Sequence, residues 1–347
     1  MKEKEDLVEM YVKFCEPYAV RMAAKDIDVI ERVPACCRCA LAVAIGLMAV
    51  AGSSYANARP ASSADAVNAM DISAMKNSAL SGLASGRRVV DAGGGCVAEL
   101  TIDEALQRNV SEILARNADT NDTGVGWAVL LSAKDGAVLA LADCGDSPRP
   151  LALTRTFMPG HLMSPLTVAA AIDAGIAGPD TGLFTDISEA LYYQRKPSND
   201  GSYIWEATLS ISNALVYSSD AVLSKLGMLI GRDRECDVLN KFGVGIMSGI
   251  GFPDEALGRL LPPESCCRLH IERTPIGQGV EISAIQVARA YATLANHGRR
   301  IDPYVVKTIS DASGTVVYEH AASTSMVQAV SRNAADITCA ILEGADT

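Results

Sequence analysis

Two hairpin signals separated by a long, mostly helical stretch constrain the fold of this 347-residue chain more than any other feature. The first lies at 127–141, where two apolar runs flank the turn sequence SAKDG, and the second at 304–318, where DASG supplies the turn. Asp and Gly in such a turn favour a tight connection between antiparallel strands. Strands on both sides of a helical region predict an α+β domain in which helices pack on an antiparallel sheet.

Apolar residues at helical spacing predict the elements around the hairpins. Thr101 and Glu104 fit a capping box, which predicts an amphipathic helix that ends near Asn117. Further helices are expected at 165–174, 211–229, 232–242, 283–296 and 333–343. Gly175 and Gly298 directly follow two of them, as expected for helix ends.

Charge and cysteine spacing narrow the range of partners. The chain has 41 acidic and 30 basic residues, a net charge of -11, and no basic block, so a nucleic-acid partner is disfavoured. Its 10 cysteines include adjacent Cys266 and Cys267, and one pair, Cys36 and Cys39, has the C-x-x-C spacing of zinc and redox sites, without the second pair that a four-cysteine zinc site needs. We therefore expect the cysteines to be small apolar side chains, and we expect no metal and no cofactor.

An uncharged apolar run at 39–52 carries the prediction of compartment. The run is shorter than the ~20 residues of a bilayer-spanning helix, but an extension to Ala58 would reach that length. The bases that precede it include Arg21, Lys25, Arg32 and Arg38, a bias that keeps the N-terminus inside. A single-pass inner-membrane anchor is therefore expected, or a signal peptide cleaved after Ala58. A buried, alanine-rich core helix is the alternative.

These signals divide the chain into four parts. Residues 1–38 are expected to be a cytoplasmic tail, 39–58 the signal anchor or signal peptide, 59–97 a linker rich in Ala, Ser, Gly and Asn, and 98–347 a folded domain outside the cytoplasm.

Seven short sequences in the last part occur in the order found in one enzyme family. They are TIDEALQ at 101–107, DGAVLALA at 135–142, FMPG at 157–160 leading into PLTVAAAI, FGVG at 242–245, GIGFP at 249–253, PIGQG at 275–279 and AYATLAN at 290–296. In this order they resemble the transpeptidase domain of class B penicillin-binding proteins, of the cell-division or elongation type. The resemblance implies a transpeptidase/β-lactamase-like fold, a serine D,D-transpeptidase ancestry, and peptidoglycan stem peptides or envelope and divisome proteins as partners.

The motifs that carry this family's chemistry are altered here. In S-x-x-K the serine attacks the substrate carbonyl and the lysine assists, whereas this chain has His161 at the serine position and Ser164 at the lysine position. Ser218, Ser219 and Asp220 replace S-x-N, and they also suit the N-cap of a helix.

K-T-G is also missing. The KTI sequence at 307–309 lies in a predicted strand, too early for the motif, and the family would place K-T-G beyond residue 344. A domain that lacks its last strands, with an open sheet edge, is therefore expected. The literal S-x-x-K at 73–76 lies in the expected linker and is interpreted as coincidence.

Three hypotheses follow from these departures. The first is a catalytically inactive transpeptidase-like protein, either a pseudoenzyme or an interaction module. The second is an acyl-transferase in which His161 serves Ser164 as base, three positions away on one helix face, although the sequence identifies no group to orient the pair. The third is a gene fragment without function. The groove-lining candidates that the resemblance adds are Ser219, Gly277, Gln278 and Gly279.

Overall fold

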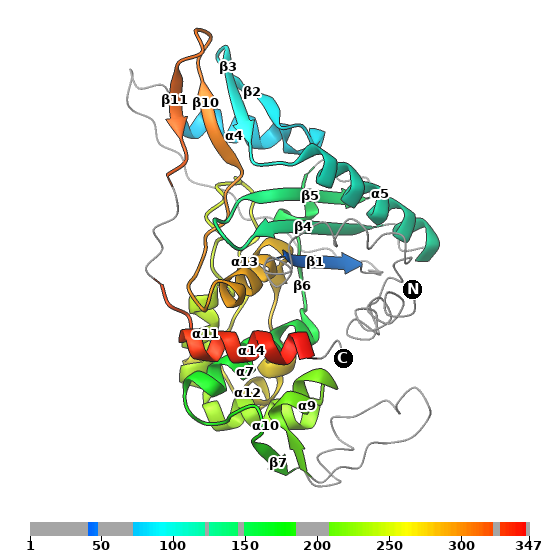
Figure 1. The fold of residues 1–347 in the computed structure, drawn as a ribbon, viewed down its shortest axis with the longest axis vertical. Coiled ribbons are helices and arrows are strands. Elements are labelled where there is room, and N and C mark those ends of the chain that lie inside the picture. Colours follow the sequence, from blue (N-terminus) through cyan, green and yellow to red (C-terminus); the bar gives the residue numbers. More distant parts are fainter. Residues whose placement is uncertain are drawn as a thin grey trace.

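The computed structural model describes residues 41–47, 72–121, 125–144, 149–184, 208–321 and 327–344. These residues form three tiers along the long axis of the molecule (Figure 1). A small sheet with one helix lies at one end, a second sheet lies in the middle, and a helical region forms the other end. The predicted α+β architecture, with helices against antiparallel sheets, is confirmed.

The central sheet is built on the first predicted hairpin, which is confirmed. Strand β4 (Gly126–Ser132) pairs antiparallel with β5 (Val138–Cys144), and Gly136 in the turn has φ +83°. Helix α5 (Glu104–Asn121) lies along β5. Gln107 fastens this helix to the strand, because its amide accepts from Leu141 N at 2.8 Å and donates to Leu141 O at 2.9 Å.

The other edge of β4 is covered by strand β1 (Leu41–Leu47), so the sheet order is β1-β4-β5. For Leu41–Leu47 the structure therefore shows a strand that covers the edge of β4, where the sequence predicted part of a helical anchor. An apolar run can satisfy its backbone by pairing with an unpaired strand as well as by forming a helix, and length alone does not decide between them. No helix in the described ranges is long and apolar enough to cross a membrane. The rest of 39–58 lies outside the described residues.

The small sheet joins residues from both ends of the domain in the order β11-β10-β3-β2. Its strands are β2 (Val89–Gly93), β3 (Cys96–Leu100), β10 (Val306–Ser310) and β11 (Val316–Glu319), which confirms the second hairpin. Helix α4 (Ile72–Ser81) and the 3-10 turn η2 (Gly82–Ser85) pack against it. The linker prediction is thus wrong over 72–95, because Leu80 and Leu83 bury enough apolar surface to order this segment.

The start of α5 also differs from expectation. Asp103, and not Thr101, caps the helix, since its Oδ1 accepts from Ala105 N at 2.9 Å and from Leu106 N at 3.0 Å. Thr101 donates instead to Val138 O on β5 at 2.7 Å, and Glu104 accepts from Arg88 N at 2.9 Å. The helix is therefore capped two residues later than the capping-box pattern predicts, because Thr101 and Glu104 form hydrogen bonds with other elements.

The helical region contains the remaining predicted helices. Its elements are α6 (Leu151–Thr154), η3 (Gly160–Met163), α7 (Ser164–Asp173), α9 (Ile211–Val216), α10 (Asp220–Ile230), α11 (Arg232–Phe242), η4 (Pro263–Ser265), α12 (Arg268–Arg273), η5 (Thr274–Ile276), α13 (Ala284–Ala295) and α14 (Arg332–Gly344). Two short strand pairs accompany them, β6 (Thr156–Phe157) with β9 (Ile282–Ser283) and β7 (Gly182–Phe184) with β8 (Thr208–Ser210). The single helix expected at 211–229 is broken at Ser218, whose φ of +52° ends α9 before α10 begins.

Helix α7 forms the centre of this region. Every residue from its first to Ala171 is buried, and α10, α11 and α14 pack around it. Helix α13 lies between this helical layer and the central sheet, where it contacts β1 and β4 (Figure 1). A buried central helix surrounded on several sides holds its first turn rigidly, and that turn carries the altered motif residues.

Candidate functional site

Three segments that are distant in sequence meet at the first turn of α7. The turn η3 carries His161 and leads directly into Ser164, the first residue of α7. The N-terminus of α10 supplies Asp220, and η5 supplies the carbonyl of Pro275. The structure therefore brings together three of the four motif positions singled out from the sequence.

A chain of polar contacts links these groups. The His161 Nδ1 atom lies 3.1 Å from Ser164 Oγ, and its Nε2 lies 2.7 Å from Asp220 Oδ1. Ser164 Oγ in turn donates to the carbonyl oxygen of Pro275 at 3.1 Å. Asp220 is thus the orienting group for the His161 and Ser164 pair, which the sequence alone did not identify. The signal was present as the aspartate in the S-x-N position, but its meaning depended on the contact with His161.

Proton counting shows that this chain of contacts is closed. The hydroxyl of Ser164 has one proton, which points to Pro275 O, so the hydroxyl oxygen is left to accept from His161 Nδ1. The other ring nitrogen faces Asp220. Both ring nitrogens of His161 therefore face a protein partner.

Burial differs sharply among the three side chains. Ser164 is only 1% exposed, whereas the side chains of His161 and Asp220 are 27% and 25% exposed. A serine nucleophile has to reach a substrate carbonyl, and a general base needs a ring nitrogen free to take its proton. In this structure the Ser164 hydroxyl is enclosed and bonded to Pro275 O, and the three contacts join η3, α10 and η5.

Gly277 explains how closely η5 approaches η3. Its φ is +69°, and a Cβ atom at this position would collide with the backbone of Gly160. Only glycine allows this approach, which brings the Pro275 carbonyl within reach of Ser164. Gln278 is partly exposed and Gly279 is exposed on the same turn, next to the polar cluster in sequence. Their groove-lining role stays a prediction.

The two serines before Asp220 do not act as side-chain caps. Ser219 occupies the N-cap position of α10 in extended conformation, but its side chain makes no capping bond. It is buried at 5% exposure, and Ser218 adopts the left-handed conformation that ends α9. The N-cap interpretation is thus right for position and wrong for hydrogen bonding.

Neither alternative lysine lies in this cluster. Lys76 of the literal S-x-x-K is on α4, with its Nζ 3.7 Å from the centre of the Tyr318 ring. Lys307 is on β10, where its Nζ lies 3.2 Å from Glu99. The structure supports both earlier interpretations, of a coincidental S-x-x-K and of a KTI sequence in a strand remote from the motif positions.

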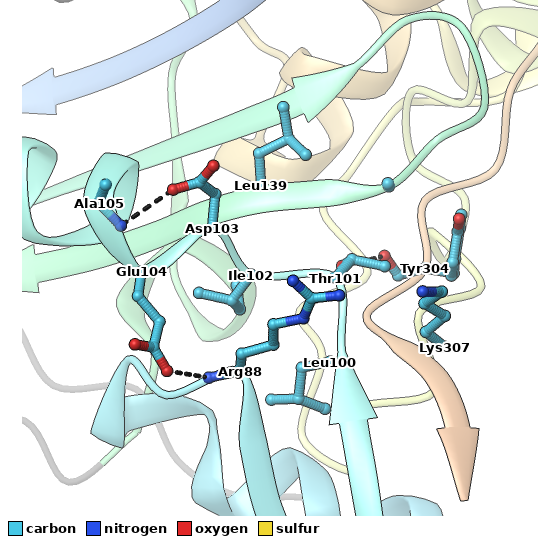
Figure 2. Close-up of a pocket in the computed structure, with 11 residues that line it drawn as sticks. Arg88, Leu100, Thr101, Ile102, Asp103, Glu104, Ala105, Leu139, Tyr304 and Lys307 are labelled. Carbon is cyan, nitrogen blue, oxygen red and sulfur yellow. Dashed lines mark hydrogen bonds between the residues drawn. The ribbon is translucent and has the colours of Figure 1, made fainter.

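Figure 2 shows the pocket that Lys307 lines with Arg88, at the junction of the two sheets. Its charged groups already have protein partners: Glu99 binds Arg88 and Lys307, which lower the pKa of Glu99, with the Arg88 hydrogen bond as the main cause. Glu104 and Asp103 are used by the start of α5, as the dashed lines show. The charged groups of this pocket therefore serve to join the small sheet to the central sheet.

Metal ligation has no support in the part of the chain that the structure describes. No group of three His, Cys, Asp or Glu residues there is placed to hold a metal ion. The expected absence of a cofactor stays a prediction.

Comparison with known proteins was made for the whole chain. The family described as "Penicillin binding protein transpeptidase domain" matches residues 126–346. Penicillin-binding protein PbpB of Mycolicibacterium smegmatis is 29% identical over 242 residues, which are 66% of this chain and 37% of that protein. The probable peptidoglycan D,D-transpeptidase PenA of Neisseria flavescens is 27% identical, with 57% of this chain and 52% of the relative covered. The chain thus spans between about a third and a half of these relatives.

Solved structures agree on the fold. Penicillin binding protein 3 of Mycobacterium tuberculosis superimposes with a TM-score of 0.61 at 24% identity, over 70% of this chain and 56% of that one. A peptidoglycan glycosyltransferase from Burkholderia ambifaria gives a TM-score of 0.58 at 26% identity, over 70% of this chain and 73% of that one.

Proposed function

Because the chain belongs to the penicillin-binding protein transpeptidase family, we propose that it is a non-catalytic member that binds peptidoglycan stem peptides. The observation that carries the proposal is the closed contact chain of Ser164, His161 and Asp220, anchored on the Pro275 carbonyl. The relatives named as peptidoglycan D,D-transpeptidases act on this substrate, which supports peptidoglycan as the ligand class.

The physical case against acyl transfer rests on the cost of releasing these groups. The Ser164 hydroxyl would have to leave Pro275 O, and the Nδ1 atom of His161, which donates to Ser164 in this arrangement, would have to lose its proton before it could accept one. Donors for a developing oxyanion would then have to be placed around a hydroxyl that is enclosed in protein. A site assembled in this way lacks the preorganisation on which such catalysis depends.

One observation favours the second candidate function, a serine acyl-transferase with a rearranged site. The order of contacts from Asp220 through His161 to Ser164 is the order of a serine–histidine–aspartate triad. For this function η5 would have to move away and expose Ser164. The same experiment separates the two candidates.

We expect no covalent labelling when the full chain is incubated with a fluorescent penicillin, because Ser164, the serine at the altered motif, is buried and bonded to Pro275 O. Labelling is measured by in-gel fluorescence and by mass spectrometry of the intact protein. Loss of one member of a cooperating catalytic set can already reduce rates by a factor on the order of a million. A label that is present on the native chain and absent from Ser164→Ala would overturn the proposal and support the triad.

Binding is tested separately by sedimentation of the full chain with intact purified peptidoglycan. We expect the chain to co-sediment, and Gln278→Ala to weaken binding because this side chain is partly exposed beside the polar cluster. Lys134→Ala in the β4–β5 turn is the matched surface control. Failure of the native chain to co-sediment would point to an envelope or divisome protein as the partner.

We also propose that the domain lies outside the cytoplasm, where peptidoglycan is, with residues 39–58 as an inner-membrane anchor. The support is the uncharged run and the bases before it. A bilayer span and strand β1 are alternative states of Leu41–Leu47, because backbone groups that bond to β4 in the sheet bond within a helix in lipid.

A reporter that is active only when exported, fused after Gly95, is expected to be active. This fusion ends before β4, so β1 has no sheet partner and only the export signal is tested. Ile45→Arg, which puts a charge into the apolar run, is expected to abolish the activity. Activity of a cytoplasm-only reporter at the same junction would exclude the export proposal.

A further inference from the structure

Two cysteines outside the candidate site share one hydrogen-bond acceptor. Cys236 lies on the buried side of α11 at 5% exposure, and Cys266 directly follows η4 and is partly exposed. The Cys236 thiol donates to the carbonyl oxygen of Leu261 at 3.5 Å, and the Cys266 thiol donates to the same oxygen at 3.6 Å. The fold therefore brings both thiols to one carbonyl oxygen.

The surrounding backbone supports this closeness. Helix α11 packs against η4, so the two segments that carry the thiols are neighbours. Burial raises the pKa of Cys236 to about 12, and the nearby Cys266 is the next cause. The pKa of Cys266 is raised by burial and partly lowered by a hydrogen bond with Cys236. Because the two thiols reach one carbonyl oxygen, at 3.5 and 3.6 Å, their sulfur atoms lie within about 7 Å of each other before any oxidation, and a side-chain shift brings them to bonding geometry.

Cys267 is adjacent in sequence but faces elsewhere. It is exposed, and its Sγ lies 3.3 Å from His270 Nδ1 at the start of α12. Cys266 thus faces α11 while Cys267 faces its own helix. The pair that the fold brings together is Cys236 with Cys266, although the sequence places Cys266 beside Cys267.

We propose that Cys236 and Cys266 are a site of intramolecular disulfide formation, with a small-molecule disulfide as the oxidant. The more exposed Cys266 loses its proton, and its thiolate attacks one sulfur of the oxidant, which releases one thiolate and leaves a mixed disulfide. The Cys236 thiolate then attacks the Cys266 sulfur and releases the second. Two protein thiols are oxidised, one disulfide is reduced to two thiols, and the two thiol protons pass to the released thiolates.

The crosslink would restrict the movement of the segment that ends in η5, beside the candidate site. It joins α11 to the segment that leads through α12 into η5, and η5 supplies the carbonyl that binds Ser164. The loop it closes contains the segment between α11 and η4, so it restricts the unfolded chain as well.

The test treats the purified full chain with oxidised glutathione, blocks remaining thiols with an alkylating reagent, and maps tryptic peptides without reduction. Cys236 lies on the peptide 235–241, whereas Cys266 and Cys267 share the peptide 260–268. Variants Cys266→Ala and Cys267→Ala therefore identify the partner. We expect a crosslink between the two peptides in the native chain and in Cys267→Ala, and its loss in Cys266→Ala and Cys236→Ala.

Thermal unfolding provides a second measurement. The oxidised native chain is expected to unfold several degrees higher than its reduced form, and Cys266→Ala is expected to show no such shift. Persistence of the crosslink in Cys266→Ala, alkylation of Cys236 after oxidation, or formation of glutathione adducts alone would overturn the proposal.

Discussion

Replacement of Arg289 by alanine is expected to lower the free energy of unfolding by about 3–5 kcal/mol. Arg289 is on α13, is 1% exposed, and donates to the carbonyl oxygens of Gly243, Ile246 and Met247 at 2.6, 2.7 and 2.8 Å. Removal of the guanidinium takes one donor from each of these carbonyls, of which Ile246 O keeps the amide of Gln286, and leaves the space of a buried side chain empty. Burial lowers the pKa of Arg289 to about 10, and the nearby Asp302 opposes that shift, so the side chain stays charged at neutral pH.

Urea denaturation measures this loss of stability, and two further variants test whether it comes from the buried guanidinium. Arg299→Ala changes an exposed arginine just beyond the same helix and is expected to stay within ~0.5 kcal/mol of the native chain. Arg289→Lys keeps the charge but cannot reach three carbonyls with one ammonium, so an intermediate loss is expected. A cost for Arg289→Ala no larger than that of Arg299→Ala would show that the segment after α11 does not depend on this side chain.

The second large effect is a pH dependence centred on Glu235. This residue of α11 is 2% exposed, and within the described ranges Thr167 of α7 supplies its side-chain hydrogen bond at 3.4 Å. Burial raises the pKa of Glu235 to about 8, with the Thr167 bond acting in the opposite direction. One long hydrogen bond does not replace the lost hydration of a carboxylate.

The direction in which stability changes with pH follows from the number of protons that Glu235 binds in the folded and unfolded chain. An unfolded glutamate titrates near pH ~4.3, so between that pH and about 8 the folded chain holds a proton that the unfolded chain has lost. Stability is therefore fully present at low pH and falls as the pH rises toward 8, by on the order of a few kcal/mol. Above that pH both states are ionised and this contribution no longer changes.

Glu235→Gln is expected to remove this slope. The free energy of unfolding is measured in urea at pH 5 and at pH 8. At pH 5 the native chain and the variant should differ little in this free energy. At pH 8 the glutamine variant should be the more stable. Glu264→Gln, at an exposed position in η4, is the matched control and should follow the native chain. Parallel pH profiles for the native chain and Glu235→Gln would mean that the buried carboxyl ionises without cost.

Local signals in the sequence predicted the elements that depend on neighbours in the chain. The Asp–Gly turns located both hairpins, and helical periodicity located α7, α11 and α13 to within a residue or two. Seven short sequences in order predicted the family, and the comparisons confirm it. These features need only turn geometry, spacing and order, all of which are written along the chain.

Contacts between distant segments were decided by the tertiary structure. The capping box failed because Thr101 and Glu104 found partners in other elements, and the linker over 72–95 is ordered because α4 found a sheet to cover. The apolar run at 41–47 was read as a helix because composition alone does not reveal an unpaired strand edge.

In the candidate site, too, some features follow from the sequence and others only from the tertiary structure. The sequence by itself determined which residues replace the family motifs, because order along the chain aligns His161, Ser164 and Asp220 with them. Only the tertiary structure decided that Asp220 orients His161 and that Pro275 takes the Ser164 proton. Hydrogen bonds act over about 3 Å, so their partners are set by the packing of α7, α10 and η5, which spacing in the sequence does not encode.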